Sequence, residues 1–413
     1  MTVAQMGTAA REAARGLARM GTLQKNAVLE AMAEALMASQ DTILTANARD
    51  VARARENGLS EALIDRLRLT PERLAGTAQG VREVAALEDP VGEGVRHWRR
   101  PNGLEITEIR VPLGVVGIIY ESRPNVTADA AALCLKAGNA VILRGGTESI
   151  DTNTALADTL IAAGEGAGMP PGALQLIRDT DRQRVTELVR LNGLVDVVIP
   201  RGGPGLKKAI IASATVPVIE TGAGVCHIFV DESADGGQAE AIILNAKVQR
   251  PGVCNAIETL LVHRGAAARI LPGVGAALMA AGVELRGCEE TRRWLPEARP
   301  ATEADWQEEY LSLILAIRVV DSLEEAMDHI YRYGTGHSEA ILTQDYTNAR
   351  RFQAQVDAAA VYVNASTRFT DGSEFGFGAE IGISTQKLHA RGPMGLRELT
   401  TSKYLITGDG QIR

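Results

Sequence analysis

The sequence predicts an α/β protein built from two doubly wound domains and a separate β arm. From Gly114 onward, short runs of β-branched and apolar residues alternate with helical segments, which is typical of parallel strands joined by helical crossovers. The same rhythm begins again after Gly224, and the 413 residues exceed what one compact core usually holds. Two stretches with the alternation of strands, 101–112 and the C-terminal tail, lie outside this rhythm and predict the arm.

The N-terminal part, residues 1–58, is expected to be helical. Apolar side chains recur there at helical spacing, for example at Val28, Met32 and Leu36. The segment ITEIRVP (106–112) instead alternates apolar and polar residues, as a half-exposed strand does.

The first doubly wound domain is expected to contain five parallel strands with helices between them. The runs that predict these strands are VVGIIY (115–120), AVILR (140–144), QLI (175–177), VDVVI (195–199) and VPVIE (216–220). Helices are expected near 150–163, 180–191 and 204–213. A sheet of this type commonly binds a nucleotide beyond the carboxyl ends of its strands.

The second domain repeats the pattern after the glycines of TGAGVC, near 221–226. Its expected strands are HIFV (227–230), IETLLVH (257–263), LILAIRVV (313–320), EAILT (339–343) and AAVYVN (359–364). We therefore assign 1–225, with a return segment of about 371–398, to the first domain and 226–370 to the second. Segments 100–112 and 399–413 form the expected arm, whose exposed edges favour pairing with a second subunit.

Composition excludes several classes of function. The net charge of −8 argues against nucleic acid or an anionic membrane as the main partner. The four cysteines form no CxxC pair and no zinc-ligand spacing, so neither a metal site nor a disulfide framework is expected. The N-terminus lacks an apolar signal core, and no apolar run approaches the ~20 residues of a membrane span. A cytoplasmic enzyme with reduced cysteines is the expectation.

Cys254 is the candidate nucleophile. It lies in QRPGVCNAIETLLV, after a Pro-Gly pair and before an apolar strand. A cysteine in a tight turn can be exposed and electropositive, which lowers the pKa of its thiol. A buried, unreactive cysteine is the alternative, and Cys134, on an apolar helix, fits that alternative well.

Two further residues follow predicted strands of the first domain. Glu220 ends VPVIE, where α/β sheets bind ligands, although a solvated loop carboxylate is the alternative. Asn125 follows VVGIIY and precedes a helix. Its amide could donate to an oxyanion, or its side chain could cap the helix.

Two glycine-rich turns run from a strand into a helix. These are RGGTES (144–149) and PRGGPGLKKAI (200–210), whose backbone N–H groups could face a phosphate or ribose. GEGAGMPPG (164–172) follows a helix instead of a strand, so it is expected to be a helix end and loop.

Several of these segments resemble the aldehyde dehydrogenase superfamily. PLGVVGIIYESRPN resembles the strand that leads to the oxyanion-hole asparagine, and VILRGGTES resembles the strand that ends at the adenosine ribose. VIETGAG resembles the Glu-Leu-Gly-Gly motif, and RPGVCNAIETLLV resembles the segment around the catalytic cysteine. EEYLSLILAIRVVDSLEEA (308–326) resembles the segment whose glutamate, here Glu309, contacts the nicotinamide ribose.

Three departures narrow the resemblance to the γ-glutamyl phosphate reductases, a branch of that superfamily. ETGAGVCH replaces Glu-Leu-Gly-Gly-Lys, and the segments 319–341 and 375–413 resemble that branch over long stretches. The resemblance covers nearly the whole chain from about residue 20.

The resemblance implies NADPH-dependent reduction of L-glutamyl 5-phosphate to L-glutamate 5-semialdehyde, through a Cys254 thioester, in proline biosynthesis. The arm favours a homo-oligomer, and association with glutamate 5-kinase, which makes the substrate, stays open. Neutral Thr147 and cationic Arg144 favour NADPH over NADH, with Glu148 expected to point away from the ribose. The implied catalytic residues are Cys254, Asn125 and Glu220; the cofactor residues are Arg144, Gly145, Gly146, Thr147, Arg201, Gly202, Gly203 and Glu309; the substrate residues are Arg123 and Arg368.

Two other functions stay open at this point. One is an NAD(P)-dependent aldehyde dehydrogenase that hydrolyses the thioester, with Glu220 activating water. The other is a scaffold of the same fold without catalysis. The intact set of Cys254, Asn125 and Glu220 argues against the scaffold, and the C-terminal segment argues against the hydrolytic enzyme.

Overall fold

The computed structural model describes residues 1–121 and 123–413, and the chain divides into two compact units. Unit 1 contains residues 1–220, 376–382 and 394–413, and unit 2 contains 221–375 and 383–393. The division after residue 220 lies five residues before the boundary expected from sequence. Residues 371–375 and 383–393, expected in the return segment of the first domain, belong to unit 2. In the described ranges, no helix combines the length and the apolar character needed to cross a membrane.

The N-terminal region of unit 1 is helical, as expected, and continues further than residue 58. Pro71 occupies the first position of the fifth helix, and the Thr70 hydroxyl accepts a hydrogen bond from the Arg73 N–H at 3.2 Å, so this helix begins with both a favourable residue and a cap. The second helix packs against the fifth. The helices are α1 (Val3–Leu17), α2 (Thr22–Ala38), α3 (Gln40–Glu56), α4 (Glu61–Leu67) and α5 (Pro71–Ala86).

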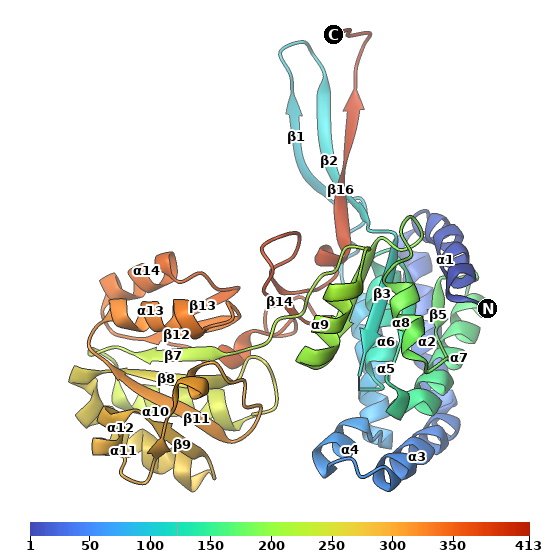
Figure 1. Ribbon diagram of the computed structural model, residues 1–413. Coiled ribbons are helices and arrows are strands. Elements are labelled where there is room, and N and C mark those ends of the chain that lie inside the picture. The colour runs from blue at the N-terminus through green and yellow to red at the C-terminus, as the bar shows by residue number, and fades with distance from the viewer. Residues whose placement is uncertain (122) are drawn as a thin grey trace. The chain divides into compact units, whose positions relative to one another are not determined.

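A four-stranded parallel sheet forms the centre of unit 1, in the order β5-β4-β3-β6 (Figure 1). Its strands are β3 (Val115–Tyr120), β4 (Ala140–Arg144), β5 (Leu174–Leu176) and β6 (Val197–Arg201), and its helices are α6 (Val126–Lys136), α7 (Ile150–Gly166), α8 (Arg182–Leu188) and α9 (Pro204–Ser213). The strand predicted at 216–220 is wrong, because only Val218 bridges Val198 there. Pro217 has no N–H to donate to a ladder.

Unit 2 contains a seven-stranded parallel sheet in the order β10-β9-β11-β8-β7-β12-β13. Helices cover both faces (Figure 1), with α10, α11 and α12 on one and α13 and α14 on the other. Central strands buried on both faces explain the nearly continuous apolar runs of the sequence. The strands are β7 (Cys226–Val230), β8 (Ile257–His263), β9 (Glu284–Gly287), β10 (Arg299–Pro300), β11 (Ile314–Val320), β12 (Ser338–Leu342) and β13 (Ala360–Val363). The helices are α10 (Gly236–Val248), α11 (Arg264–Ala280), α12 (Glu289–Trp294), α13 (Leu323–Tyr333) and α14 (Tyr346–Gln355), and a short hairpin is formed by β14 (Ile383–Ser384) and β15 (Gly392–Pro393).

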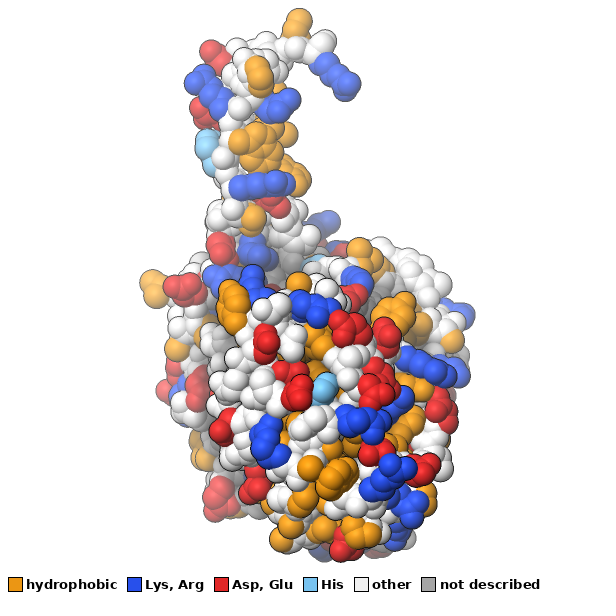
Figure 2. Space-filling view, turned by 90° about the vertical axis from the view of Figure 1, so that its left-hand side faces the viewer, with side chains coloured by type: hydrophobic (Ala, Val, Ile, Leu, Met, Phe, Trp, Pro, Cys, Tyr) orange, Lys and Arg blue, Asp and Glu red, His pale blue; other side chains and the backbone are white. Residues whose placement is uncertain are grey.

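The arm is a three-stranded antiparallel sheet that projects from the rest of unit 1 (Figure 1). It consists of β1 (Gly94–Arg99), β2 (Glu105–Pro112) and β16 (Thr400–Thr407). The expected arm began at residue 100, so the structure adds β1 to it. Trp98 of β1 and Tyr404 of β16 meet edge to face across β2, with ring centroids 6.2 Å apart. Figure 2 shows hydrophobic side chains gathered along one side of this arm.

Candidate active site

The strand order of unit 1 reverses between β3 and β6, and the residues that follow these two strands carry predicted site residues. Asn125 and Arg123 come after β3, and Arg201, Gly202 and Gly203 lie at the end of β6. Doubly wound sheets bind ligands in the crevice at such a reversal. The two groups of residues that the sequence separates are therefore neighbours at one edge of the sheet.

The Asn125 side chain does not cap its helix. Asn125 precedes α6 without a side-chain capping bond, and its Nδ2 donates to Oδ2 of Asp129 at 2.8 Å. Burial raises the pKa of Asp129 to about 6, and the hydrogen bond from Asn125 and the charge of Arg201 oppose this rise. Asp129 is partly exposed at the start of α6. The capping alternative for Asn125 is excluded.

The turn after β6 is occupied by a carboxylate. The N–H of Gly203, which caps α9, donates to Oε2 of Glu121 at 2.9 Å. A Cβ at position 202 would press against the same carboxyl group, so glycine is needed for this close approach. A phosphate at these N–H groups, as expected from the sequence, would have to displace Glu121.

The end of β4 differs from expectation in two side chains. Arg144 is buried, and its Nη1 and Nη2 donate to the carbonyl oxygens of Gly145 at 2.7 Å and Thr180 at 2.8 Å. Glu148 was expected to point away, but its carboxylate folds back over Gly146, where a Cβ would overlap it. Burial lowers the pKa of Arg144, and the nearby Glu148 is the largest opposing charge. Thr147 is exposed at this strand end.

In unit 2, Cys254 lies in a turn directly before β8 and is partly exposed. The other three cysteines have different surroundings. Cys134 and Cys226 are fully buried, and burial raises the pKa of both thiols. Cys288 sits at the N-terminus of α12 with its sulfur 3.2 Å from the Thr291 hydroxyl. Exposure separates Cys254 from Cys134 and Cys226, and its position in the turn before β8 separates it from the partly exposed Cys288.

The loop 221–225 lies directly against the Cys254 turn. A Cβ at Gly224 would overlap the carbonyl oxygen of Cys254, and the Sγ of Cys226 donates to the same oxygen at 3.1 Å. The N–H of Gly224 donates to Oε1 of Glu309 at 2.7 Å. Glu309, the predicted ribose ligand, is thus connected to the Cys254 turn through one glycine.

Asn255 and Arg368 hold the other side of the turn. The Nε of Arg368 donates to Oε1 of Gln249 at 2.9 Å, and its Nη1 donates to Oδ1 of Asn255. The buried Asn255 amide donates to the carbonyl of Thr370 at 2.9 Å. Burial lowers the pKa of Arg368, and Arg250 lowers it further, whereas Asp371, Cys254 and Glu374 raise it. The Arg368 guanidinium therefore connects Gln249 with Asn255, the residue directly after Cys254, and the charge of Cys254 raises its pKa.

The predicted site residues are thus found in two groups, one in each unit. Unit 2 brings Cys254, Glu309 and Arg368 together, and unit 1 brings Asn125 and Arg201 together around Asp129. Glu220 is half-buried at the end of the first segment of unit 1. Sequence reasoning missed Asp129 and Asn255, although the i,i+4 spacing of Asn125 and Asp129 on a helix is a readable signal.

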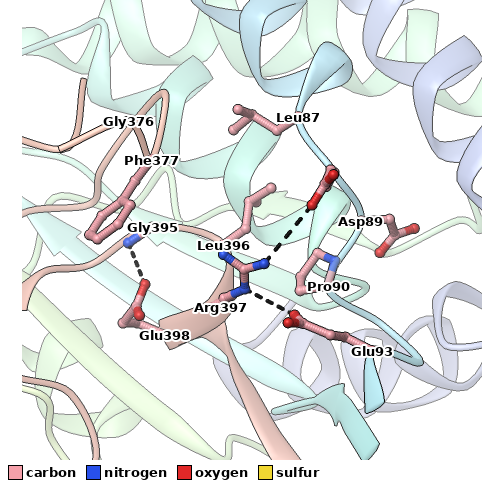
Figure 3. Close-up of a pocket in the computed structure, with 11 residues that line it drawn as sticks. Leu87, Asp89, Pro90, Glu93, Gly376, Phe377, Gly395, Leu396, Arg397 and Glu398 are labelled. Atoms are coloured by element: carbon pink, nitrogen blue, oxygen red, sulfur yellow. Dashed lines mark hydrogen bonds and ion pairs between the residues drawn. The ribbon is translucent and has the colours of Figure 1, made fainter. Parts of the chain in front are cut away.

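A pocket of about 320 Å³ in unit 1 contains none of the predicted site residues. Figure 3 shows Arg397 at its centre, with its Nε 2.9 Å from a carboxylate oxygen of Glu93, while Glu398 accepts from the Gly395 N–H at 2.9 Å. Arg397 joins the segment 395–398 to the base of the arm through Glu93 and to Glu88, and Glu398 holds the backbone of Gly395. It is therefore a structural connection within unit 1.

Comparisons of the sequence and fold with known proteins identify the family. The model of the aldehyde dehydrogenase family matches residues 1–287 and 299–404. A γ-glutamyl phosphate reductase from Moorella thermoacetica is 62% identical over 413 residues, covering 100% of this chain and 99% of the relative. The crystal structure of a γ-glutamyl phosphate reductase from Thermotoga maritima is 50% identical, with a TM-score of 0.98 and 100% of both chains covered.

A more distant structure shows the fold alone. An acetylating aldehyde dehydrogenase from Geobacillus thermoglucosidasius is 20% identical, with a TM-score of 0.71 over 100% of this chain and 97% of that chain. The predicted α/β class and the predicted resemblance are both confirmed. The chain belongs to the γ-glutamyl phosphate reductases, within the aldehyde dehydrogenase family.

Proposed function

We propose that this chain reduces L-glutamyl 5-phosphate to L-glutamate 5-semialdehyde with NADPH and releases phosphate, in proline biosynthesis. The observation that carries the proposal is the partly exposed Cys254 in a braced turn with the Arg368 guanidinium nearby. The names of relatives at 62% and 50% identity support the substrate.

Cys254 is the nucleophile of this reaction. Its thiolate attacks the acyl carbon, the bond from carbon to the phosphate oxygen breaks, and phosphate leaves as a thioester forms on sulfur. The cofactor, when bound, supplies the hydride that reduces this thioester. Collapse of the resulting hemithioacetal then releases the aldehyde and returns the thiolate. Arg368, whose guanidinium donates to the neighbouring Asn255, brings a positive charge to this turn, and positive charge near a cysteine favours the thiolate form that the reaction needs.

We assign the Asn125 amide to the oxyanion that develops in both steps. Its Nδ2 carries two N–H bonds, and the one directed at Asp129 fixes the end of the amide that donates. A preorganised donor of this kind contributes roughly 3–4 kcal/mol in comparable sites.

The residues of unit 1 fit a nicotinamide cofactor. The sheet has the order of a nucleotide-binding half, and the turn after β4 carries Gly145 and Gly146, with exposed Thr147 beyond them. We assign Gly202 and Gly203 to the same cofactor and Glu309 to its ribose. Preference for NADPH is supported by neutral Thr147, whereas Arg144 is turned toward backbone carbonyls and contributes long-range charge.

The substrate carries two anionic groups, and we assign Arg123 and Arg368 to them. Arg368 uses two of its N–H groups on Gln249 and Asn255, so its ligand role is combined with support of the turn. Glu220 is assigned to proton handling near the thiol, since an acyl phosphate reductase needs no water activation.

One assay tests this function against its alternatives. Purified protein is given glutamate semialdehyde and NADP, with phosphate, with arsenate, or in phosphate-free buffer. The proposal predicts NADP reduction that requires phosphate or arsenate, because the thioester needs an acyl acceptor. Full activity without either would support the hydrolytic dehydrogenase, and no turnover in any condition would support the scaffold.

We further propose that the arm joins copies of this chain. Both outer strands, β1 and β16, present an edge, and apolar side chains are exposed on β16. Association with the kinase that makes the labile acyl phosphate remains part of the proposal, and co-sedimentation of the two proteins tests it.

A further inference from the structure

We infer that Asp129 is a positioning residue that orients the Asn125 amide for oxyanion binding, and that its ionised form is the active one. The inference rests on the proposed function, because it concerns the group assigned to the oxyanion. It is carried by the contact between Nδ2 of Asn125 and Oδ2 of Asp129 at 2.8 Å.

The geometry follows from the helix that contains Asp129. Asn125 lies directly before α6 and Asp129 lies in its first turn, so residues i and i+4 face one another. An ionised carboxylate accepts hydrogen bonds and cannot donate them. The NH2 end of the amide must therefore face Asp129, and its second N–H keeps a fixed direction.

Protonation of Asp129 would remove this constraint. A carboxylic acid can donate its O–H to the Asn125 carbonyl oxygen, so the amide could turn by half a rotation. The acceptor and donor ends would then exchange places, and an oxyanion would meet a carbonyl oxygen instead of an N–H. The catalytic donor is thus correctly oriented only while Asp129 carries its charge.

The surroundings of Asp129 place this protonation within an accessible pH range. Burial raises the pKa of Asp129 to about 6, against the Asn125 hydrogen bond and the charge of Arg201 at the end of β6. On the neighbouring helix α5, a Cβ built at Gly80 would lie 3.9 Å from Oδ1 of Asp129. The charge of Arg201 favours the ionised form of the carboxylate.

The first experiment is a comparison of pH profiles. In the wild-type enzyme, kcat should fall below an apparent pKa near 6. Asp129→Asn keeps the size of the side chain but permits both amide orientations, so we expect kcat at pH 8 to fall by about tenfold or more. The acid limb near pH 6 should disappear, while KM for NADP changes little. Asp129→Glu should restore part of kcat and an acid limb.

A double-mutant cycle separates positioning from general support of the fold. If Asp129 acts through Asn125, Asp129→Asn should have almost no further effect on kcat in an Asn125→Ala background. Asp151→Asn removes a partly exposed carboxylate from the first turn of another helix of unit 1, α7, and should leave the pH profile unchanged. Additive losses in the cycle would overturn the inference.

A direct measurement needs no turnover. The side-chain amide resonance of Asn125, identified by its loss in Asn125→Ala, should shift with pH around a midpoint near 6 in the ligand-free wild type. That shift should be absent in Asp129→Asn. A resonance that does not titrate would overturn the inference. Absence of any activity in the wild type would overturn the proposed function instead.

Discussion

Four cysteines of one chain show how position decides chemistry. Cys134 and Cys226 are enclosed, so their neutral thiols are favoured and they behave as small apolar side chains. Cys254 has the same side chain, but it is partly exposed in a turn whose next residue, Asn255, accepts a hydrogen bond from Arg368. The sequence could predict this difference because Pro251 and Gly252 mark a turn, whereas Cys134 lies in an apolar helix.

Replacement of the nucleophile should remove the activity. We expect Cys254→Ala to lower kcat by several orders of magnitude, because the covalent route is lost. Cys134→Ala and Cys288→Ala should keep most of it. The measurement is steady-state NADP reduction with the semialdehyde and phosphate. Near-normal turnover by Cys254→Ala would contradict the mechanism.

A methyl group at Gly224 should be as damaging as loss of a functional group. The added Cβ would overlap the Cys254 carbonyl oxygen, so Gly224→Ala must displace the turn that carries the nucleophile. We expect kcat to fall at least about 100-fold, as for a displacement of about 1 Å. Gly76→Ala is the matched control, since Gly76 lies in α5 with nothing within 4 Å of its Cβ position. Equal activity of the two variants would contradict this account.

At the scale of elements, regular patterns were predictable and long-range partners were not. The strands that were predicted correctly are apolar runs of three to eight residues, whose pattern depends on local sequence. The buried Arg144 was expected to face the cofactor, but its partner Thr180 lies 36 residues away. Contacts with the backbone of a distant loop fix the orientation of such a side chain, and the periodicity of the local sequence does not predict these contacts.

The carboxylate of Glu148 gives a test at the end of β4. It lies over Gly146, so it should repel the 2′-phosphate of NADPH more than the 2′-hydroxyl of NADH. We expect Glu148→Gln to increase the ratio of kcat/KM for NADPH to that for NADH, by about three- to tenfold, since one exposed charge contact is worth roughly 1 kcal/mol. Glu187→Gln, a change on α8, should leave the ratio as it is. A ratio that falls in Glu148→Gln would show that this strand end does not face the ribose.

Helix α13 packs a neutral histidine against the sheet of unit 2. His329 is buried, with Trp306 and Tyr333 around its ring, and its Nδ1 accepts from Nη1 of Arg318 at 3.2 Å. Burial lowers the pKa of His329 to about 2, and the charges of His227, Arg318 and Arg332 act in the same direction. Below about pH 6.5, His329 is therefore protonated in the unfolded chain but stays neutral in the native state.

This histidine should make unit 2 sensitive to acid. Because its pKa is lower in the native state, its contribution to stability is complete above about pH 6.5 and is lost as the pH falls below that value. The free energy of unfolding should decrease by up to about 1.4 kcal/mol per pH unit between pH 6 and 4. In His329→Gln, this dependence of the free energy of unfolding on pH should be absent. In His97→Gln, which replaces an exposed histidine of the arm, it should remain. Urea unfolding at several pH values measures it, and equal slopes in wild type and His329→Gln would contradict the assignment.

At the scale of the whole molecule, the arm is the part of unit 1 that has little core of its own. Its three strands bury few side chains, and Tyr404 and Ile406 are 51% and 62% exposed on the strand β16. An isolated antiparallel sheet of this size needs a further hydrophobic contact for stability. Exposed strand edges next to apolar side chains are surfaces on which another chain can add. We therefore expect a second copy of this chain to cover the arm.

Two substitutions on that strand should change the assembly without changing the fold. Tyr404→Ser combined with Ile406→Ser removes apolar area that the single chain leaves exposed. Tyr404→Ser also removes the ring contact with Trp98, so an isolated copy should lose about 0.5–1.5 kcal/mol at this position and about 0.5 kcal/mol at Ile406. The oligomer should dissociate at concentrations where the wild type stays assembled, as measured by sedimentation velocity. Leu23→Ser and Tyr331→Ser are matched controls, because Leu23 and Tyr331 are 84% and 90% exposed on helices outside the arm. If the double arm variant sediments as the wild type does while the controls dissociate, the interface lies on the helices and not on the arm.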